Sequence, residues 1–61
     1  MMGSEEVEID GQLITVQMPV GNIQVSDKQV TYSDASGTSS CRFSTPDIAQ
    51  QFADWLQAQT L

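Results

Sequence analysis

Apolar and polar residues alternate along most of residues 5–44 of this chain. In the segment EEVEIDGQLITVQM, Asp10-Gly11 predicts a two-residue hairpin turn, because a type I′ turn needs positive φ at both central positions. Closing the hairpin there pairs Ile9 with Gln12 and Val7 with Ile14, and it puts the apolar side chains on one face. The other face is polar apart from one apolar residue, Leu13; it also carries Glu6, Glu8, Asp10, Thr15 and Gln17.

Two later turns extend the pattern. A two-residue loop at Asp27-Lys28 closes one hairpin, and a two-residue loop at Ser36-Gly37 closes the next. The apolar pairs that follow from these loops are Val25–Val30, Ile23–Tyr32, Tyr32–Cys41 and Val30–Phe43. All six side chains fall on one face, so two independent turns predict the same apolar side of a sheet.

The connection MPVGN decides whether the two halves share that face. A two-residue connection at Pro19-Val20 keeps Val16 and Ile23 on the same side, whereas a three-residue loop puts the second half on the opposite side. We expect one continuous face, because the chain has too few large apolar residues to fill two cores.

The end of the chain has helical periodicity instead. Thr45 is a suitable N-cap, Pro46 suits the first helical position, and Asp47 lies in the first turn, where a carboxylate meets the positive end of the helix dipole. The apolar stripe comprises Ile48, Ala49, Phe52, Ala53, Trp55, Leu56 and Gln59, and the wet side comprises Gln50, Gln51, Asp54, Gln57 and Ala58. The spacing predicts an amphipathic helix over about residues 46–59.

A sheet with one apolar face and a helix with one apolar stripe are each unstable alone and together form a two-layer domain. The sequence therefore predicts an α+β fold. It is an antiparallel meander of four to five strands within residues 5–44, with one C-terminal amphipathic helix packed across one face. Residues 5–61 are expected to form a single small domain, and residues 1–4, MMGS, to be a start and possible expression scar.

The net negative charge argues against two classes of binding partner, nucleic acids and anionic membranes. The chain has 61 residues and a net charge of −6, from eight acids against Lys28 and Arg42. Direct binding to nucleic acid or to anionic membranes is disfavoured, because both rest on Lys and Arg. No apolar run approaches the length of a membrane span, and a single unpaired Cys suits a reducing compartment, so we expect a cytoplasmic protein.

Candidate chemistry is sparse, and we expect no catalytic residue, metal site or cofactor. Cys41 has no His in the chain to activate it, and its register places it beside Tyr32 on the core face. The row Glu6, Glu8 and Asp10 suggests either a hard-cation site or, as we prefer, a charged edge that opposes aggregation. Phe52 and Trp55 suggest a partner anchor or, as we prefer, the core beneath the sheet.

The segment CRFSTPDIAQQFADWL, residues 41–56, resembles the last strand and helix of pleckstrin-homology-like barrels. Those barrels have more strands than this chain supplies, and their lipid-binding members use basic loops that are missing here. The resemblance therefore assigns no family.

The thin core and a final strand without acids from Ser39 to Ser44 favour a small non-enzymatic interaction or accessory protein. It would act as a homo-oligomer or as a subunit of a larger complex, with strand addition at the last edge as one route. An acidic nucleic-acid mimic that binds a basic protein site is the alternative, and a minor subunit of a shared catalytic site is a third reading. The predicted partner contacts are Leu13, Ser40, Arg42, Glu6 and Glu8.

Overall fold

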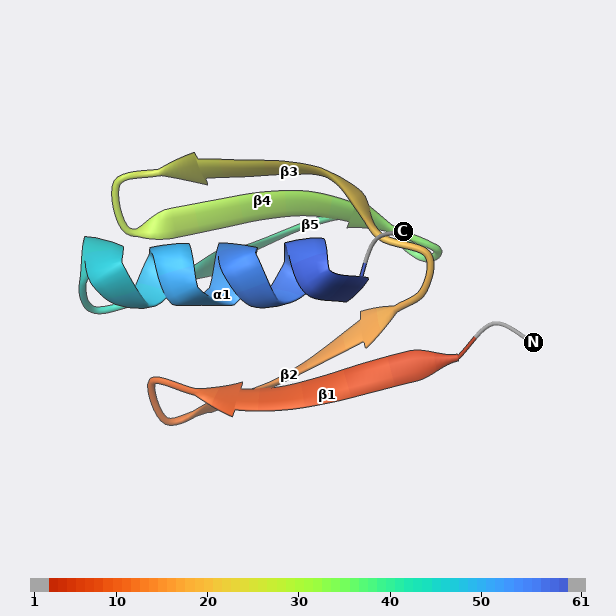
Figure 1. Ribbon diagram of the computed structural model, residues 1–61, viewed down its shortest axis with the longest axis horizontal. Coiled ribbons are helices and arrows are strands. Elements are labelled where there is room, and N and C mark those ends of the chain that lie inside the picture. The colour runs from red at the N-terminus through yellow and green to blue at the C-terminus, as the bar shows by residue number, and fades with distance from the viewer. Residues whose placement is uncertain (1–2, 60–61) are drawn as a thin grey trace.

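The computed structural model describes residues 3–59 as five strands followed by one helix (Figure 1). The elements are β1 (Ser4–Ile9), β2 (Gln12–Gln17), β3 (Gly21–Ser26), β4 (Gln29–Asp34), β5 (Gly37–Arg42) and α1 (Pro46–Gln59). The α+β class and the C-terminal helix are confirmed. β1 begins at Ser4, one residue earlier than expected, and the backbone N–H of Met18 donates to the carbonyl of Gly3.

The antiparallel strands form two sheets, β1-β2 and β3-β4-β5. Figure 1 shows α1 running along the three-stranded sheet, with the first hairpin on the other side of the helix in this view. The meander is divided because β2 and β3 do not pair. Pro19 lacks an N–H for a ladder, and the N–H and C=O of Gln17 bond instead to Asp34 and Ala35. The five strands therefore do not form the continuous sheet that a barrel requires.

The first hairpin has the predicted register. Val7 pairs with Ile14 and Ile9 with Gln12, and both turn residues have positive φ, 55° at Asp10 and 72° at Gly11. Asp is among the few side chains that tolerate this conformation, and Gly adopts it without cost. The local sequence is thus sufficient to fix this hairpin.

The second hairpin follows the predicted loop but contains a bulge. Val25 pairs with Val30 as expected. The register then shifts between Gly21 and Gln24, so the predicted Ile23–Tyr32 pair is replaced by an irregularity that contains Asn22 at φ 52°. A bulge bends a strand. Ile23 still packs against the core, whereas Val25 is 39% exposed.

The β4–β5 register differs from the prediction by two residues. The turn falls at Ala35-Ser36, so Tyr32 pairs with Ser39 and Val30 with Cys41. The cause is the carboxylate of Asp34, which accepts hydrogen bonds from the backbone N–H and hydroxyl of Ser36 at 3.0 Å and 2.7 Å. Gly37 then starts β5 at φ 125°, which favours glycine. A shift of two keeps each side chain on its face, so the predicted faces survive.

α1 begins and ends where the sequence predicts. The Thr45 hydroxyl accepts a hydrogen bond from the N–H of Ile48 at 3.2 Å, and the Thr45 carbonyl accepts one from Ala49. This is N-cap geometry. The helix packs on β3 and β4. Its wet side is exposed as predicted, and its fully buried residues are Ala49, Phe52, Ala53 and Leu56.

One core serves both sheets, as expected from the small number of large apolar residues. Phe52 is its centre: it is fully buried and contacts the rings of Tyr32, Phe43 and Trp55 at centroid distances of 5.9, 5.2 and 5.9 Å. The buried cluster comprises Ile14, Val16, Val20, Val30, Tyr32, Phe43, Ala49, Phe52, Ala53 and Leu56. Residues from the first hairpin, the second sheet and the helix are thus buried together.

Polar contacts fasten the first hairpin to the second sheet at two separate places. At one, the Asp10 carboxylate accepts hydrogen bonds from Ser44. At the other, an oxygen of the Asp34 carboxylate accepts a hydrogen bond from the Gln17 N–H at 3.2 Å. These contacts replace the missing ladder between the sheets.

Candidate functional site

Cys41 lies in the interior, half-buried against the core. Burial raises the pKa of its thiol, and a hydrogen bond with Tyr32 offsets this only in part. Burial, followed by the neighbouring Cys41, raises the pKa of Tyr32 to about 12. Both groups are therefore protonated near neutral pH, and the environment opposes formation of a reactive thiolate. This is the core position that the sequence predicts.

The aromatic residues of α1 also belong to the core. The ring of Trp55 stacks on Phe52 with an interplanar angle of 15°, and its indole is partly buried. The amide of Gln59 donates to the carbonyl of Trp55 at 3.3 Å. Trp55 is thus packed against the core beside Phe52.

The first candidate surface is the outer side of the first hairpin, which we call the acidic hairpin face: Glu6, Glu8, Leu13 and Thr15. Leu13 is 69% exposed and lies directly opposite Glu8. Glu6 lies opposite Thr15, whose hydroxyl donates to the Glu6 carboxylate at 3.4 Å. Three of the five predicted contact residues are therefore neighbours, with an apolar side chain beside two carboxylates.

The other two predicted contacts, Ser40 and Arg42, lie on β5. Ser40 is exposed and lies opposite Thr31, and Arg42 lies opposite Gln29. The carbonyl of Arg42 accepts a hydrogen bond from the side-chain amide of Gln12 at 2.9 Å. The structure thus separates these two residues from the acidic hairpin face and places the backbone of β5 against the first hairpin.

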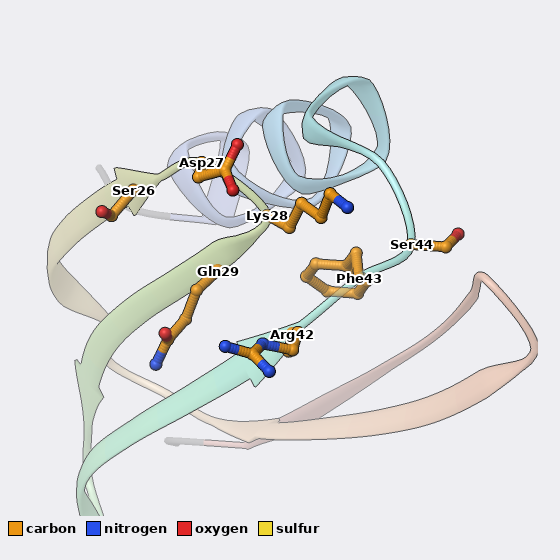
Figure 2. Close-up of a pocket in the computed structure, with 7 residues that line it drawn as sticks. All are labelled: Ser26, Asp27, Lys28, Gln29, Arg42, Phe43 and Ser44. Atoms are coloured by element: carbon orange, nitrogen blue, oxygen red, sulfur yellow. The ribbon is translucent and has the colours of Figure 1, made fainter.

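Arg42 belongs instead to a second candidate surface, which we call the basic hollow (Figure 2). It is an open cavity of about 560 Å³ at the end of the β4–β5 ladder. Its lining residues are Ser26, Asp27, Lys28, Gln29, Arg42, Phe43 and Ser44. Both cationic residues of the chain therefore line one cavity.

The sequence did not predict this cavity because it assigned the wrong partner to Arg42. The predicted register places Arg42 opposite Thr31, whereas the structure pairs it with Gln29, beside the turn that carries Lys28. The backbone N–H of Phe43 also donates to the carbonyl of Lys28 at 2.8 Å. The sequence signal for the correct register is Asp34-x-Ser36, because hydrogen bonds from Ser36 to the Asp34 carboxylate fix the position of the turn.

Among residues 3–59, no three of the Cys, Asp and Glu side chains gather in a group that could hold a metal ion. No helix in that range combines the length and the apolar character needed to cross a bilayer.

Comparison with known proteins gives no assignment. No protein-family model matches the chain, and neither a curated protein nor a solved structure has significant similarity to it.

Proposed function

We propose that this chain is a small non-enzymatic interaction protein that works as an accessory subunit of a larger complex. The acidic hairpin face would be its contact surface. The observation that carries the proposal is the 69% exposure of Leu13 in a strand whose other aliphatic residues, Ile14 and Val16, are buried. Leu13 is the one apolar residue on the outer face of this hairpin and adds nothing to the core, so the proposal takes it as apolar area that a partner could bury.

The side chains of the acidic hairpin face indicate which surface properties a partner should have. An exposed Leu supplies apolar area that a partner can bury, and the carboxylates of Glu6 and Glu8 favour a basic surface around that contact. Opposite charge also speeds association and excludes acidic competitors. The partner is therefore expected to have a small apolar depression with Lys or Arg around it.

The same charges argue against a symmetric homodimer through this face. A two-fold axis brings a surface against its own copy, so Glu6 and Glu8 would meet like charges. Like charges placed together in an interface are destabilising. A different protein with a basic surface fits better than a second copy.

Strand addition at β5 is less favourable than the sequence suggested. Gln12 and Asp10 of the first hairpin bond to the backbone of Arg42 and Ser44 at the C-terminal end of that strand. An added strand would have to displace these contacts.

We place the protein in the cytoplasm, because its single Cys needs no oxidising compartment.

The test compares two variants of the full chain in quantitative capture from an extract of the native host. Leu13→Gln removes the apolar side chain from the acidic hairpin face, and Val25→Gln is the matched control on the other sheet, where Val25 is 39% exposed. We expect a bound protein that the unmodified chain and the control retain and that Leu13→Gln loses. Sedimentation of each variant gives the oligomeric state.

The Leu13→Gln substitution is expected to change the free energy of unfolding by no more than about 0.5 kcal/mol, because the site is exposed. Loss of binding can therefore be separated from loss of folding. Equal capture by Leu13→Gln and the unmodified chain would exclude the acidic hairpin face. A monomer that retains no protein at all would exclude the function.

A further inference from the structure

The two cations of this chain have an unexpected position. In a protein with eight acids and two bases, the nearest partner for each base is expected to be a carboxylate. Yet Lys28, in the β3–β4 turn, and Arg42, at the end of β5, both line the basic hollow. Within residues 3–59, neither side chain forms an ion pair or a side-chain hydrogen bond. Two positive charges without an ion-pair partner among residues 3–59 thus line the same cavity.

The two charges lie apart within the cavity. Figure 2 shows Lys28 extending past one side of Phe43, with its Nζ toward Ser44, and Arg42 on the other side, with its guanidinium toward Gln29. The backbones that carry them are fixed, because the carbonyl of Lys28 accepts from Phe43 and the carbonyl of Arg42 accepts from Gln12. One small ion does not match this separation as well as two linked anionic groups do.

The rest of the lining is polar. Ser26, Gln29 and Ser44 supply hydroxyl and amide groups, and Phe43 is only 3% exposed. Ser44 already donates its N–H and hydroxyl to Asp10, so its hydroxyl oxygen remains as an acceptor. Such a lining suits a hydroxylated ligand better than an apolar or aromatic one, because the ligand's own polar groups find partners there.

Two carboxylates are close enough to weaken anion binding. Asp27 is itself a lining residue, and in Figure 2 it lies on the far side of Lys28 from Arg42. The Asp10 carboxylate accepts a hydrogen bond from Ser44, another lining residue. Acids further away act weakly, because the Debye length at physiological salt is about 8 Å.

We propose that the basic hollow binds a small hydroxylated organic ligand with two separated anionic groups, one at Lys28 and one at Arg42. The cavity of about 560 Å³ lies within the range of small-molecule sites. Arg offers a planar fork to an oxyanion and Lys a point charge, and phosphate groups accept both. This site shares no residue with the acidic hairpin face.

The experiment titrates the full chain with three related probes: fructose 1,6-bisphosphate, fructose 6-phosphate and fructose. Binding is followed by the backbone amide signals of residues 26–29 and 42–44 and by calorimetry. The bisphosphate is expected to bind about fivefold or more tightly than the monophosphate, which corresponds to one additional partly exposed charge pair, and fructose is expected not to bind. Added salt should weaken the bisphosphate most.

Variants assign the effect to the two cations. Lys28→Gln and Arg42→Gln are each expected to reduce bisphosphate affinity to that of the monophosphate. Both side chains are exposed and make no contact that the fold needs, so both variants should fold. Gln51→Glu, on the exposed side of α1, is the matched control, because it changes the net charge by the same −1 and should leave affinity nearly unchanged.

A fourth variant tests the position of the ligand. Asp27→Asn removes the carboxylate from the lining, and Asn tolerates the φ of 56° at this position, so binding should become tighter. Equal affinities for the bisphosphate and monophosphate would overturn the two-anion proposal. An equal loss in Lys28→Gln, Arg42→Gln and Gln51→Glu would show that only net charge matters, and it would overturn the site.

Discussion

The carboxylate of Asp10 accepts hydrogen bonds from both the backbone N–H and the hydroxyl of Ser44, at 2.9 Å and 2.8 Å, across 34 residues of sequence. This pair joins the turn of the first hairpin to the segment between β5 and α1. Because β2 forms no ladder with β3, the pair is one of the few polar links between the two sheets. It gives Asp10 a structural role in addition to its role in the turn.

Asp10→Asn should test that link without damaging the turn, since Asn tolerates the φ of 55°. The charge-assisted hydrogen bonds are lost, and we expect the free energy of unfolding to fall by about 1–2 kcal/mol in urea denaturation. Ser44→Ala removes only the hydroxyl and should cost about 1 kcal/mol. The double variant should lose less than the sum. Additive losses would mean that the two residues do not interact.

Acid should loosen the other link, at Asp34. The hydroxyl of Ser36 and then the backbone N–H groups hold the pKa of Asp34 below its ordinary value of 3.8. A depressed folded-state pKa contributes stability above the unfolded-state pKa, and this contribution is lost as the pH falls through the folded-state value.

The measurement is urea denaturation of the unmodified chain and of Asp34→Asn from pH about 5 downward. The difference in unfolding free energy between them should shrink toward low pH. Ser36→Ala removes the main cause of the pKa shift. On that background, Asp34→Asn should change the unfolding free energy at pH about 5 by less than it does in the unmodified chain. A difference that stays constant with pH would show that Asp34 is not stabilised as a carboxylate.

Alkali should destabilise the core through Tyr32. Its pKa rises from 10.0 to about 12 in the folded chain, first through burial and then through Cys41. A raised folded-state pKa contributes stability that is complete below the unfolded-state value, so stability should fall between pH 10 and about 12.

Tyr32→Phe keeps the ring and removes the titrating hydroxyl, so its unfolding free energy should fall less steeply over that range. Because burial also raises the pKa of Cys41, the comparison is best made on a Cys41→Ala background. Parallel pH profiles for the Tyr and Phe chains on that background would contradict the assignment.

Phe52→Ala should unfold the protein. Phe52 is fully buried and contacts three other rings, and truncation of a buried Phe to Ala costs about 3–5 kcal/mol. A chain of 61 residues is expected to have only marginal stability, of similar size. Phe52→Leu, which keeps most of the apolar volume, should fold with a lower melting temperature. Thermal unfolding followed by circular dichroism distinguishes the two, and a cooperative melt for Phe52→Ala would contradict the packing.

Much of this fold is determined by short stretches of sequence. Asp10-Gly11 sets the first hairpin because the φ values of the turn fix the strand twist and register. Thr45 and Pro46 set the start of α1 because the capping oxygen and the fixed φ of proline act within one turn. The alternation of apolar residues assigns the core face because side chains on a strand have a period of two.

The β4–β5 register and the division into two sheets are decided only by the tertiary structure. For the register, the reason is the two-residue period of side chains along a strand. A slip of two residues leaves every side chain on its face, so alternation could not show that Arg42 pairs with Gln29 and not with Thr31. The division into two sheets depends on Gln17, which bonds to Asp34 and Ala35 at a distance of 17 or more residues in sequence. The cavity that gathers Lys28 and Arg42 follows from that register, whose local signal, the Asp34-x-Ser36 turn, lies outside the apolar alternation.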